Sequence, residues 1–413
     1  MVEDKQVAAA IAYLRSPQAI RARCEQLLTL ACDDRLTYFR CDFNALESVA
    51  DYVLQVTRSH YPDLQVPFHS RWRHFEVGTY PRLASLEKNL VGFTTLERAR
   101  TQFDLAITSV LLDAGAGADW RYQEPATGDW FQRSEGLAIA SFDTFCQGVF
   151  SSQPEHSYQA DALGLQQLSE TALAQGFQVS TQNPLVGLSG RVELLQRLGA
   201  VVARSPALFG THPARPGHLV DFLLTQAQDG KLAASTVLNA VLTGLGEIWA
   251  GRLTLAGANL GDVWVHPALP SDELGSQLVP FHKLSQWLTY SLLEPLQTLG
   301  LTIVDLDELT GLPEYRNGGL CLDLGLLQVK DPGILQQRHL PGSEVIVEWR
   351  ALTVVLLDRI AAQLRQTLNL SAAELPLVKV LQGGTWSAGR QIAAWLRPGG
   401  IPPINLESDG TVF

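Results

Sequence analysis

Apolar residues recur at helical spacing along most of this chain, which predicts a mainly α-helical fold. Ser16 before Pro17 has the pattern of an N-cap followed by the proline favoured in a first helical turn. Further helices are expected at 44–56, 93–112, 133–149, 160–175, 190–204, 217–225, 234–250, 282–299, 348–368 and 387–396. Strand signals are short and lie near residues 251, 301 and 344, so a few short strands complete the expected fold.

The chain is long enough to bury a substantial core. It has 413 residues, of which 46 % are hydrophobic, whereas a single core usually stops growing at about 250–300 residues. We expect a single catalytic unit, 1–413, for which two fused lobes are as consistent with the length as one domain. If there are two interlocked helical lobes, they span about 1–205 and 206–413, with the site between them.

The charge balance argues against a nucleic-acid-binding protein. Lys and Arg number 31 and Asp and Glu number 42, which gives a formal net charge of −11. Binding to phosphates requires an excess of Lys and Arg on one surface, and the sequence contains no long basic run. The expected partner is a small molecule, and the sequence does not determine the oligomeric state.

Cysteine usage and hydropathy predict a cytoplasmic protein. The five cysteines are scattered without CxxC spacing, so we expect reduced core residues rather than a disulfide framework or a zinc ribbon. The N-terminal stretch has no apolar run of signal-peptide length. No segment approaches the roughly 18 apolar residues of a membrane helix, so no membrane association is expected.

The loops between the expected helices have an unusual composition, because they combine glycine or proline with aromatic and charged residues. They are VPFHSRWRHFEVGTYPRL, LLDAGAGADWRYQEP, STQNPLVGLSGR, GANLGDVWVHPALP, TGLPEYRNGG, LQGGTWSAGR and RPGGIPPINLESDGTVF. Connecting loops are usually small and polar, whereas ordered aromatic and charged loops often form binding sites. We therefore expect these loops to build one composite pocket on a helical scaffold.

Glu314 is the most distinctive charged residue of these loops. Pro313 stiffens the chain before it, and Gly318 and Gly319 allow close backbone approach after it. Two interpretations are equally open. Glu314 forms an ion pair with Arg316 that locks the loop, or it is a fixed carboxylate that orients water or stabilises a developing positive charge.

The stretch FHKLSQWLTYSLLEPL, residues 281–296, carries a second candidate surface. Lys283, Gln286 and Tyr290 share one helical stripe beside the apolar one. Such a stripe is more often a solvated helix face, and the alternative is that it lines the pocket and binds hydroxyls or a phosphate. His282 lies at the entrance to this helix.

Basic residues recur singly in the glycine-rich loops, and they are Arg71, Arg73, His74, Arg121, Arg133, Arg191 and Arg390. Of these, Arg73, His74, Arg191 and Arg390 are the candidate anion ligands. GLSGR could present backbone N–H groups and Arg191 at a helix N-terminus, although helix capping by Ser189 explains the same letters. The sequence contains no GxxxxGK[ST], strand-borne GxGxxG or GxSxG motif, which argues against ATP-binding, dinucleotide-binding and α/β-hydrolase proteins. The histidines lack zinc-site spacing, and no metal is predicted.

With these stretches in view, the chain resembles the uracil-catabolism proteins of the ring-opening route of uracil degradation, a family long described as a domain of unknown function. The stretches that carry the resemblance are SRWRHF, LLDAGAGADWRY, RSEGLA, NPLVGLSGR, GDVWVH, VPFHKLSQWLTYSLLEPL, LTGLPEYRNGGLCLDLG, VEWRALTV, GGTWSAGR and RPGGIPPINLESDGTVF. They extend from residue 70 to the C-terminus. The resemblance implies a pathway that passes through ribosylurea, or its phosphate, to urea.

A more distant resemblance concerns the reaction. LPEYRNGG followed by VEWRALTV is similar to stretches of the queuosine-salvage N-glycosidases, which have a helical, DNA-glycosylase-like scaffold. Glu314 stands where that family has Asp, which keeps the carboxylate but lengthens the side chain. This resemblance implies cleavage of a ribose–urea N-glycosidic bond on a similar helical scaffold.

Such a cleavage develops positive charge at the anomeric carbon, so it requires a nearby carboxylate and an acid for the leaving nitrogen. We assign the carboxylate to Glu314 and leave Asp113, Asp262 and His266 as candidates for the acid. Arg350 is expected to pair with a carboxylate beneath the site. The substrate-binding candidates are Arg73, His74, Trp120, Arg191, Trp264, His282, Lys283, Tyr290, Tyr315, Arg316 and Arg390.

The sequence thus predicts a helical N-glycosidase that acts on ribosylurea or its 5′-phosphate without a metal or organic cofactor. Two alternatives stay open. One is an amidohydrolase acting on an opened ureide, which normally requires a metal or an activated nucleophile. The other is a non-catalytic protein that binds a nucleotide or ureide of the same pathway.

Overall fold

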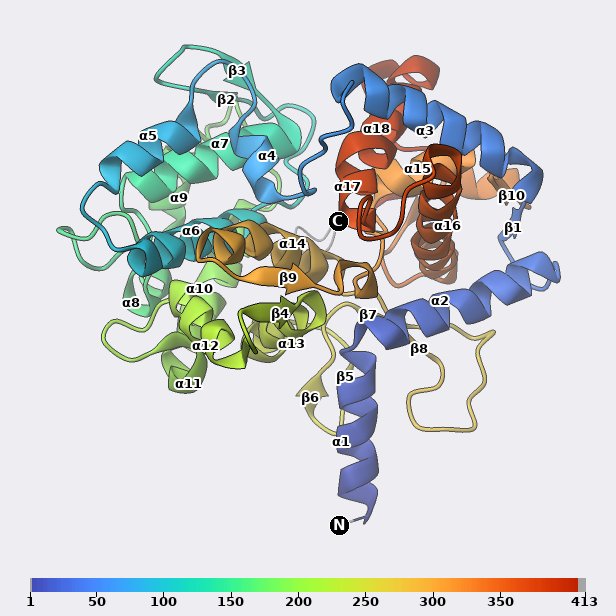
Figure 1. The fold of residues 1–413 in the computed structure, drawn as a ribbon, viewed down its shortest axis with the longest axis horizontal. Coiled ribbons are helices and arrows are strands. Elements are labelled where there is room, and N and C mark those ends of the chain that lie inside the picture. Colours follow the sequence, from blue (N-terminus) through green and yellow to red (C-terminus); the bar gives the residue numbers. More distant parts are fainter. Residues whose placement is uncertain (1, 408–413) are drawn as a thin grey trace. The chain divides into compact units, whose positions relative to one another are not determined.

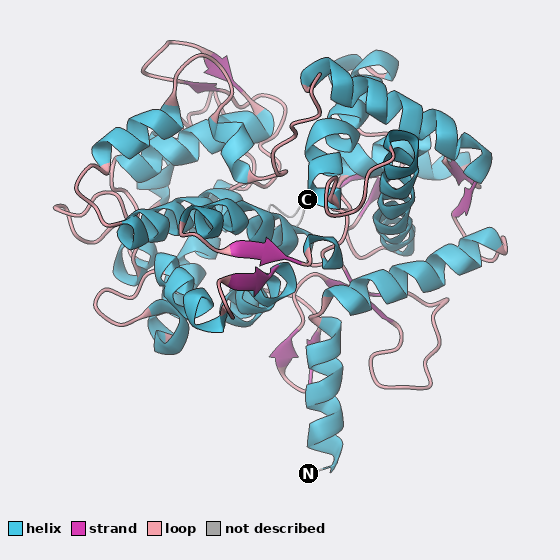
Figure 2. Cartoon of the chain, viewed as in Figure 1, coloured by secondary structure: helices cyan, strands magenta, loops and turns pink. Residues whose placement is uncertain are grey.

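The computed structural model describes residues 2–407 and confirms a mainly helical fold (Figures 1 and 2). Residues 408–413, the end of RPGGIPPINLESDGTVF, lie outside the described residues. The helices are α1 (Val2–Leu14), α2 (Pro17–Cys32), α3 (Leu46–His60), α4 (Arg71–Phe75), α5 (Arg82–Asn89), α6 (Thr95–Leu111), α7 (Arg133–Cys146), α8 (Ala162–Gln166), α9 (Glu170–Gly176), α10 (Leu188–Arg204), α11 (Pro206–Phe209), α12 (Leu219–Gln226), α13 (Ala234–Leu245), α14 (Lys283–Thr298), α15 (Tyr315–Asp323), α16 (Glu344–Leu368), α17 (Leu377–Val380) and α18 (Trp386–Leu396).

The strands are short, and each pairs with a single partner. They are β1 (Phe39–Cys41), β2 (Tyr122–Gln123), β3 (Trp130–Phe131), β4 (Lys231–Ala233), β5 (Thr254–Leu255), β6 (Ala258–Asn259), β7 (Val263–Val265), β8 (Leu278–Pro280), β9 (Thr302–Val304), β10 (Leu327–Val329), β11 (Arg338–His339) and β12 (Asn405–Leu406). The pairs are β1–β10, β2–β3, β5–β6 and β7–β8, all antiparallel, and the parallel pairs β4–β9 and β11–β12.

The chain divides into two compact units assembled from separate stretches. Unit 1 contains the residues up to His69, Gly251–Gln286 and Asp305–Glu407. Unit 2 contains Ser70–Ala250 and Trp287–Val304. These bounds differ from contiguous lobes that meet near residue 205, and helix α14 begins in unit 1 and ends in unit 2.

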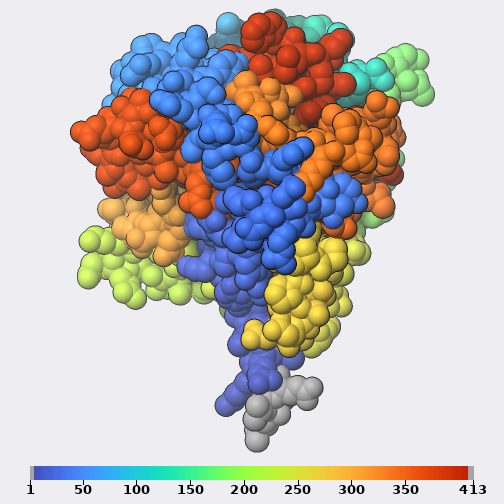
Figure 3. All heavy atoms as spheres, turned by 90° about the vertical axis from the view of Figure 1, so that its right-hand side faces the viewer, coloured from blue at the N-terminus to red at the C-terminus, as the bar shows by residue number. Residues whose placement is uncertain are grey.

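Unit 1 is built around α16, most of whose residues are buried. Helices α2, α3 and α15 pack against it, and α18 packs against α15 (Figure 1). A smaller apolar cluster joins Leu14 at the end of α1 to Leu260 and Val263. Figure 3 shows this segment, in yellow, beside the dark blue N-terminal helix.

Unit 2 has α6 at its centre. From Phe103 to Leu111 every residue of this helix is buried, and α7, α10 and α12 pack against it. Strand β9, which follows α14, pairs in parallel with β4, which directly precedes α13. The core of this unit is therefore a group of helices joined by loops, including those that carry LLDAGAGADW and RSEG.

Several local predictions are confirmed. Ser16 caps α2, because its side chain accepts the N–H of Ala19. The strands expected near residues 251 and 301 are β5 and β9. All five cysteines are free thiols, of which Cys32 is exposed rather than in the core. Across the described residues, no helix combines the length and apolarity that crossing a bilayer demands.

The prediction of a strand near residue 344 is wrong. EVIVEW forms the first turns of α16, and its residues from Val345 to Trp349 are buried on all sides of the helix. A continuous apolar run carries no alternation that separates a buried strand from a buried helix, and its β-branched residues favoured the strand. The helical spacing resumes only further along the chain.

The contact between α15 and α18 depends on Gly389, because a Cβ at this position would overlap the Arg316 carbonyl oxygen. We expect Gly389→Ala to lower the free energy of unfolding by about 1–3 kcal/mol, the usual cost of overpacking. Gly190 in α10 is the matched control, since no atom lies within 4 Å of its Cβ position. Gly190→Ala should leave stability unchanged or raise it by up to about 1 kcal/mol. Urea denaturation of both variants measures the difference, and equal stability would contradict the packing argument.

Candidate functional site

Glu314 is the N-cap of α15. Its backbone is extended, and its carboxylate accepts the N–H of Arg316 at 2.7 Å through Oε2 and that of Asn317 at 2.6 Å through Oε1. Burial raises the pKa of Glu314, while the two N–H groups and the nearby charge of Lys283 oppose that rise. The helix N-terminus therefore fixes this carboxylate in one orientation and favours its ionised form.

Arg316 does not lock the loop through Glu314. Its Nη1 donates to the Gly400 carbonyl at 2.7 Å, and its guanidinium carbon lies 4.8 Å from the centre of the Tyr315 ring. Arg316 is buried at 5 % exposure, so its donors serve the protein interior. Of the two open interpretations, the structure thus disfavours a Glu314–Arg316 ion pair and instead has a helix cap and a cation–π contact.

Lys283, at the start of α14, connects Glu314 to a group of polar and aromatic side chains. Burial lowers the pKa of His69 to about 4, and the charge of Lys283 adds to that lowering. The same charge opposes the rise that burial causes in the pKa of Glu314. His69 bonds to Gln382 at 2.9 Å, and its ring lies 6.1 Å from that of Trp386. The π-helical turn Leu381–Thr385 carries Gln382, and such turns are frequent at functional sites.

We call this group in unit 1 the Glu314 cluster. Its members are His69, Lys283, Glu314, Tyr315, Arg316, Gln382, Trp386 and Arg390. Arg390 belongs to it because its guanidinium carbon lies 5.5 Å from the centre of the Trp386 ring. The cluster combines one fixed carboxylate, cationic groups and aromatic faces, which suits a polar ligand that contains a ring.

Asp262 pairs with Arg350, as expected of a carboxylate beneath the site. The two guanidinium N–H groups donate to its oxygens at 2.7 Å each, and Trp264 Nε1 donates at 2.8 Å. Burial would raise the pKa of Asp262, but the Arg350 guanidinium holds it well below the usual range. An ionised carboxylate has no proton to donate, so Asp262 fits the role of general acid least well among the three candidates.

The two predicted histidines of unit 1 are buried beside backbone groups. His266 accepts the Ala268 N–H through Nδ1 at 3.2 Å, and His282 bonds to the Leu14 carbonyl through Nε2 at 2.8 Å. Burial lowers the pKa of His282, which favours its neutral form. His282 thus connects the end of α1 to the start of α14.

Unit 2 contains a second polar group, which we call the Asp113 cluster. Arg71 lies 2.9 Å from Asp113, and Ser134 Oγ donates to both Asp113 oxygens at 2.7 Å. His74 Nδ1 lies 3.1 Å from Ser134 Oγ. Arg71 also donates to Ser109 at 2.7 Å and is fully buried. The cluster therefore combines a buried guanidinium with a partly exposed carboxylate.

Two predicted ligands in unit 2 stabilise its interior instead. Arg191 donates to the carbonyls of Leu112, Ala114, Gly115 and Val186, and burial lowers its pKa to about 10. Its helix is capped by Gly187, and Ser189 donates to Glu170. Trp120 is fully buried and donates to the Phe177 carbonyl at 3.0 Å. These contacts fix the loop after Asp113 rather than offering donors to an anion.

The remaining predicted residues of unit 2 are Arg73 and Tyr290. Arg73 forms ion pairs with Glu76 at 3.0 Å and Glu294 at 2.9 Å. Burial raises the pKa of Glu294, which Arg73 and the Ser70 hydroxyl counteract. Tyr290 lies in α14 and is fully buried. The predicted residues are therefore divided between the two units, and only some of them belong to the two clusters.

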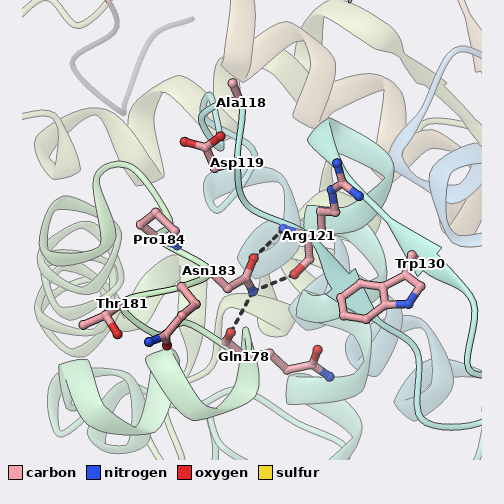
Figure 4. Close-up of a pocket in the computed structure, with 9 residues that line it drawn as sticks. Ala118, Asp119, Arg121, Trp130, Gln178, Thr181, Asn183 and Pro184 are labelled. Atoms are coloured by element: carbon pink, nitrogen blue, oxygen red, sulfur yellow. Dashed lines mark hydrogen bonds between the residues drawn. The ribbon is translucent and has the colours of Figure 1, made fainter.

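Unit 2 also has a surface pocket that contains none of the predicted site residues, although it is formed by loops that the sequence singles out. It has a volume of about 750 Å³ and is lined by Ala118, Asp119, Arg121, Trp130, Gln178, Thr181, Gln182, Asn183 and Pro184 (Figure 4). The Asn183 amide bonds to the backbone of Arg121 and to the Gln178 carbonyl. These hydrogen bonds hold the walls of the pocket together.

The predicted site residues do not include Arg71, His69 or Ser134. Arg71 and His69 lie in VPFHSRWRHF, from which Arg73 and His74 were chosen instead. Ser134 lies in RSEGLA, one of the stretches that carry the family resemblance, from which no site residue was chosen. The contacts that distinguish Arg71 from Arg73 join residues 38 to 220 positions apart. No local pattern shows which of the two arginines points into the protein.

The fold and the two clusters define a mainly helical protein with fixed polar groups in each unit. Residues 13–413 match the family described as "Protein of unknown function (DUF1688)". Protein urg3 of Schizosaccharomyces pombe is 40 % identical over 413 residues, which cover 98 % of this chain and 99 % of the relative. Uracil catabolism protein 4 of Lachancea kluyveri is 38 % identical over 437 residues, with the same coverage. The chain belongs to this family, which confirms the resemblance.

Removing one partner of the buried Asp262–Arg350 pair should be costly. Asp262→Asn leaves a guanidinium that is 1 % exposed without its carboxylate, and we expect a loss of about 3–5 kcal/mol. Because the pKa of Asp262 is lower in the folded chain, its stabilising contribution is complete above its unfolded pKa of about 4. The contribution is lost as the pH falls through the lower, folded value.

Urea titrations at several pH values measure this contribution. The stability difference between wild type and Asp262→Asn should be constant near neutral pH and narrow below about pH 4. Glu25→Gln, which removes a half-exposed partner of Arg359, is the control and should cost little. A small, pH-independent loss in Asp262→Asn would contradict the assignment.

Proposed function

We propose that this chain acts in uracil catabolism and hydrolyses the N-glycosidic bond of ribosylurea, or of its 5′-phosphate, to urea and ribose or ribose phosphate. The name of Uracil catabolism protein 4 supports the pathway. The observation that carries the reaction type is the Glu314 carboxylate, held by two backbone N–H groups at a helix N-terminus. The proposed partner is a small nucleoside-derived molecule, and the proposed location is the cytoplasm.

The chemistry follows from the charge that builds up in the transition state. As the bond to the urea nitrogen breaks, positive charge develops on the anomeric carbon and its ring oxygen. A preorganised carboxylate stabilises that charge without reorganising, and Glu314 is fixed before the substrate arrives. Water then adds to the sugar carbon, and the leaving nitrogen takes a proton.

The other members of the Glu314 cluster have complementary roles. Lys283 and Arg390 supply positive charge for a 5′-phosphate, and the faces of Tyr315 and Trp386 contact the planar urea or the ribose. Asp262 is held ionised, which argues against it as the general acid and leaves His266 as the candidate within unit 1.

The direct test is turnover of ribosylurea and its 5′-phosphate by the purified chain, with detection of urea. We expect Glu314→Gln to lose about 10²–10³-fold in kcat, the usual effect of removing one electrostatic stabiliser. The variant should lose about 1 kcal/mol of stability, because the amide NH₂ meets one of the two N–H groups. Glu308→Gln, six residues earlier in unit 1, is the control and should keep full activity.

The outcomes of this test separate the proposal from its alternatives. Full activity of Glu314→Gln overturns the assignment of the residue. Release of ammonia from an opened ureide, without urea, identifies an amidohydrolase. Tight binding of a nucleotide or ureide in calorimetry with no substrate consumed identifies a binding protein.

The pH dependence provides an independent prediction. If Glu314 acts as a carboxylate, kcat/KM falls as the pH drops through its folded pKa, which burial places above 4.5. The raised pKa also means that folding is favoured by the protonated form, so this contribution to stability is present at low pH and lost as the pH rises through the folded value. A rate profile and urea titrations measure both effects. Glu308→Gln should retain them, whereas an acid limb at or below pH 4.5 would contradict the role.

A further inference from the structure

We propose that His266, Glu344 and Glu348 form a binding site for a divalent transition-metal ion. Each side chain offers one ligand atom, and the three atoms lie within 4.8 Å of one another. Glu344 and Glu348 are one turn apart in α16 and share a face, and His266 follows β7. All three belong to unit 1.

The imidazole of His266 is the observation that points to a ligand. The side chain is fully buried, and its Nε2 atom has no hydrogen-bond partner. Nε2 lies 3.6 Å from Glu348 Oε1, so it faces the two carboxylates. A buried ring nitrogen without a partner is costly, and a metal ion between the three side chains would satisfy it.

Within the described residues, the carboxylates of Glu344 and Glu348 have no lysine or arginine as an ion-pair partner. Glu348 is fully buried. Buried carboxylates are normally paired with a cation or coordinate a metal. A divalent ion would neutralise both.

Hydrogen bonds already orient the two carboxylates. Glu348 accepts the N–H groups of Thr37 and Tyr38 at 3.1 Å each, one on each oxygen. Glu344 accepts the Thr37 hydroxyl at 3.0 Å. Each oxygen keeps a lone pair for a metal, and such supporting bonds are typical of the surroundings of metal ligands.

The donor set selects the class of metal. One imidazole with two carboxylates suits Zn²⁺, Mn²⁺ or Fe²⁺, whereas Ca²⁺ and Mg²⁺ prefer oxygen ligands alone. Glu344 is partly exposed and gives the ion access to the site. The bound ion would connect α16, the turn after β7 and the segment around Thr37, so it would stabilise unit 1.

Binding requires a change of tautomer at His266. Nδ1 accepts the Ala268 N–H at 3.2 Å, so the proton of the neutral ring is on Nε2. When Nε2 binds the metal, that proton leaves and Nδ1 takes one up, so the ring stays neutral and the contact to Ala268 opens. Imidazole nitrogen-15 resonances report this exchange.

The test uses the full-length chain with ZnCl₂ and MnCl₂ as probes. We expect one ion per chain after dialysis, measured by elemental analysis, and a higher Tm with the ion bound. Glu344→Gln should weaken the affinity by about 10–100-fold and remove the Tm shift. Glu47→Gln, an exposed acidic residue in the first turn of α3, is the matched control and should bind as wild type.

Two results would overturn the proposal: no retained ion and no Tm shift with either metal, or Glu344→Gln that binds as tightly as wild type. His266→Asn gives a second measurement, in which lost binding supports the site and unchanged binding rejects it. If that variant does not fold, Glu344→Gln still decides. Neither readout depends on hydrolysis of ribosylurea, so failure of this site and failure of the proposed function are distinguishable.

Discussion

The bidentate pair of Arg350 and Asp262 organises the polar part of unit 1. Arg350 lies within the most buried stretch of α16, and Asp262 precedes β7. Asp262 also accepts the backbone N–H of Lys283, and its carbonyl accepts that of Phe281. The start of α14, and with it the Lys283 side chain beside Glu314, is therefore positioned by a charge that α16 buries.

The same use of arginine recurs in unit 2. Arg82 pairs with Glu124 at 2.6 Å, with both side chains almost fully buried, and Arg215 pairs with Asp104 at 2.7 Å. Arg191 donates to backbone carbonyls in place of a carboxylate. Because desolvating a guanidinium is expensive, it stays buried only where several acceptors surround it, and such positions fix irregular loops. Arginine in these glycine-rich loops therefore often orders the loop itself.

The helical fold was predictable because apolar spacing and capping are local signals, as Ser16 and α2 illustrate. The prediction failed at EVIVEW, where burial on all sides removed the periodicity. At the candidate site, Glu314 and Lys283 were identified from their stretches, and their electrostatic coupling was not, because it depends on how α14 and α15 pack. The partners of Arg191 lie up to 79 positions away, a relation that no spacing in one sequence records.

Glutamate at an N-cap is less common than Ser, Thr, Asp or Asn, because its longer side chain must fold back to reach the N–H groups of the first turn. In Glu314 both oxygens make this contact, so the carboxylate cannot swing toward a substrate. The neighbouring cationic and aromatic groups must therefore position the sugar of the substrate next to the carboxylate. Burial raises the pKa of Glu314, and the N–H groups of the helix N-terminus offset part of that rise. Fixed geometry and a tuned charge thus arise from the same two hydrogen bonds.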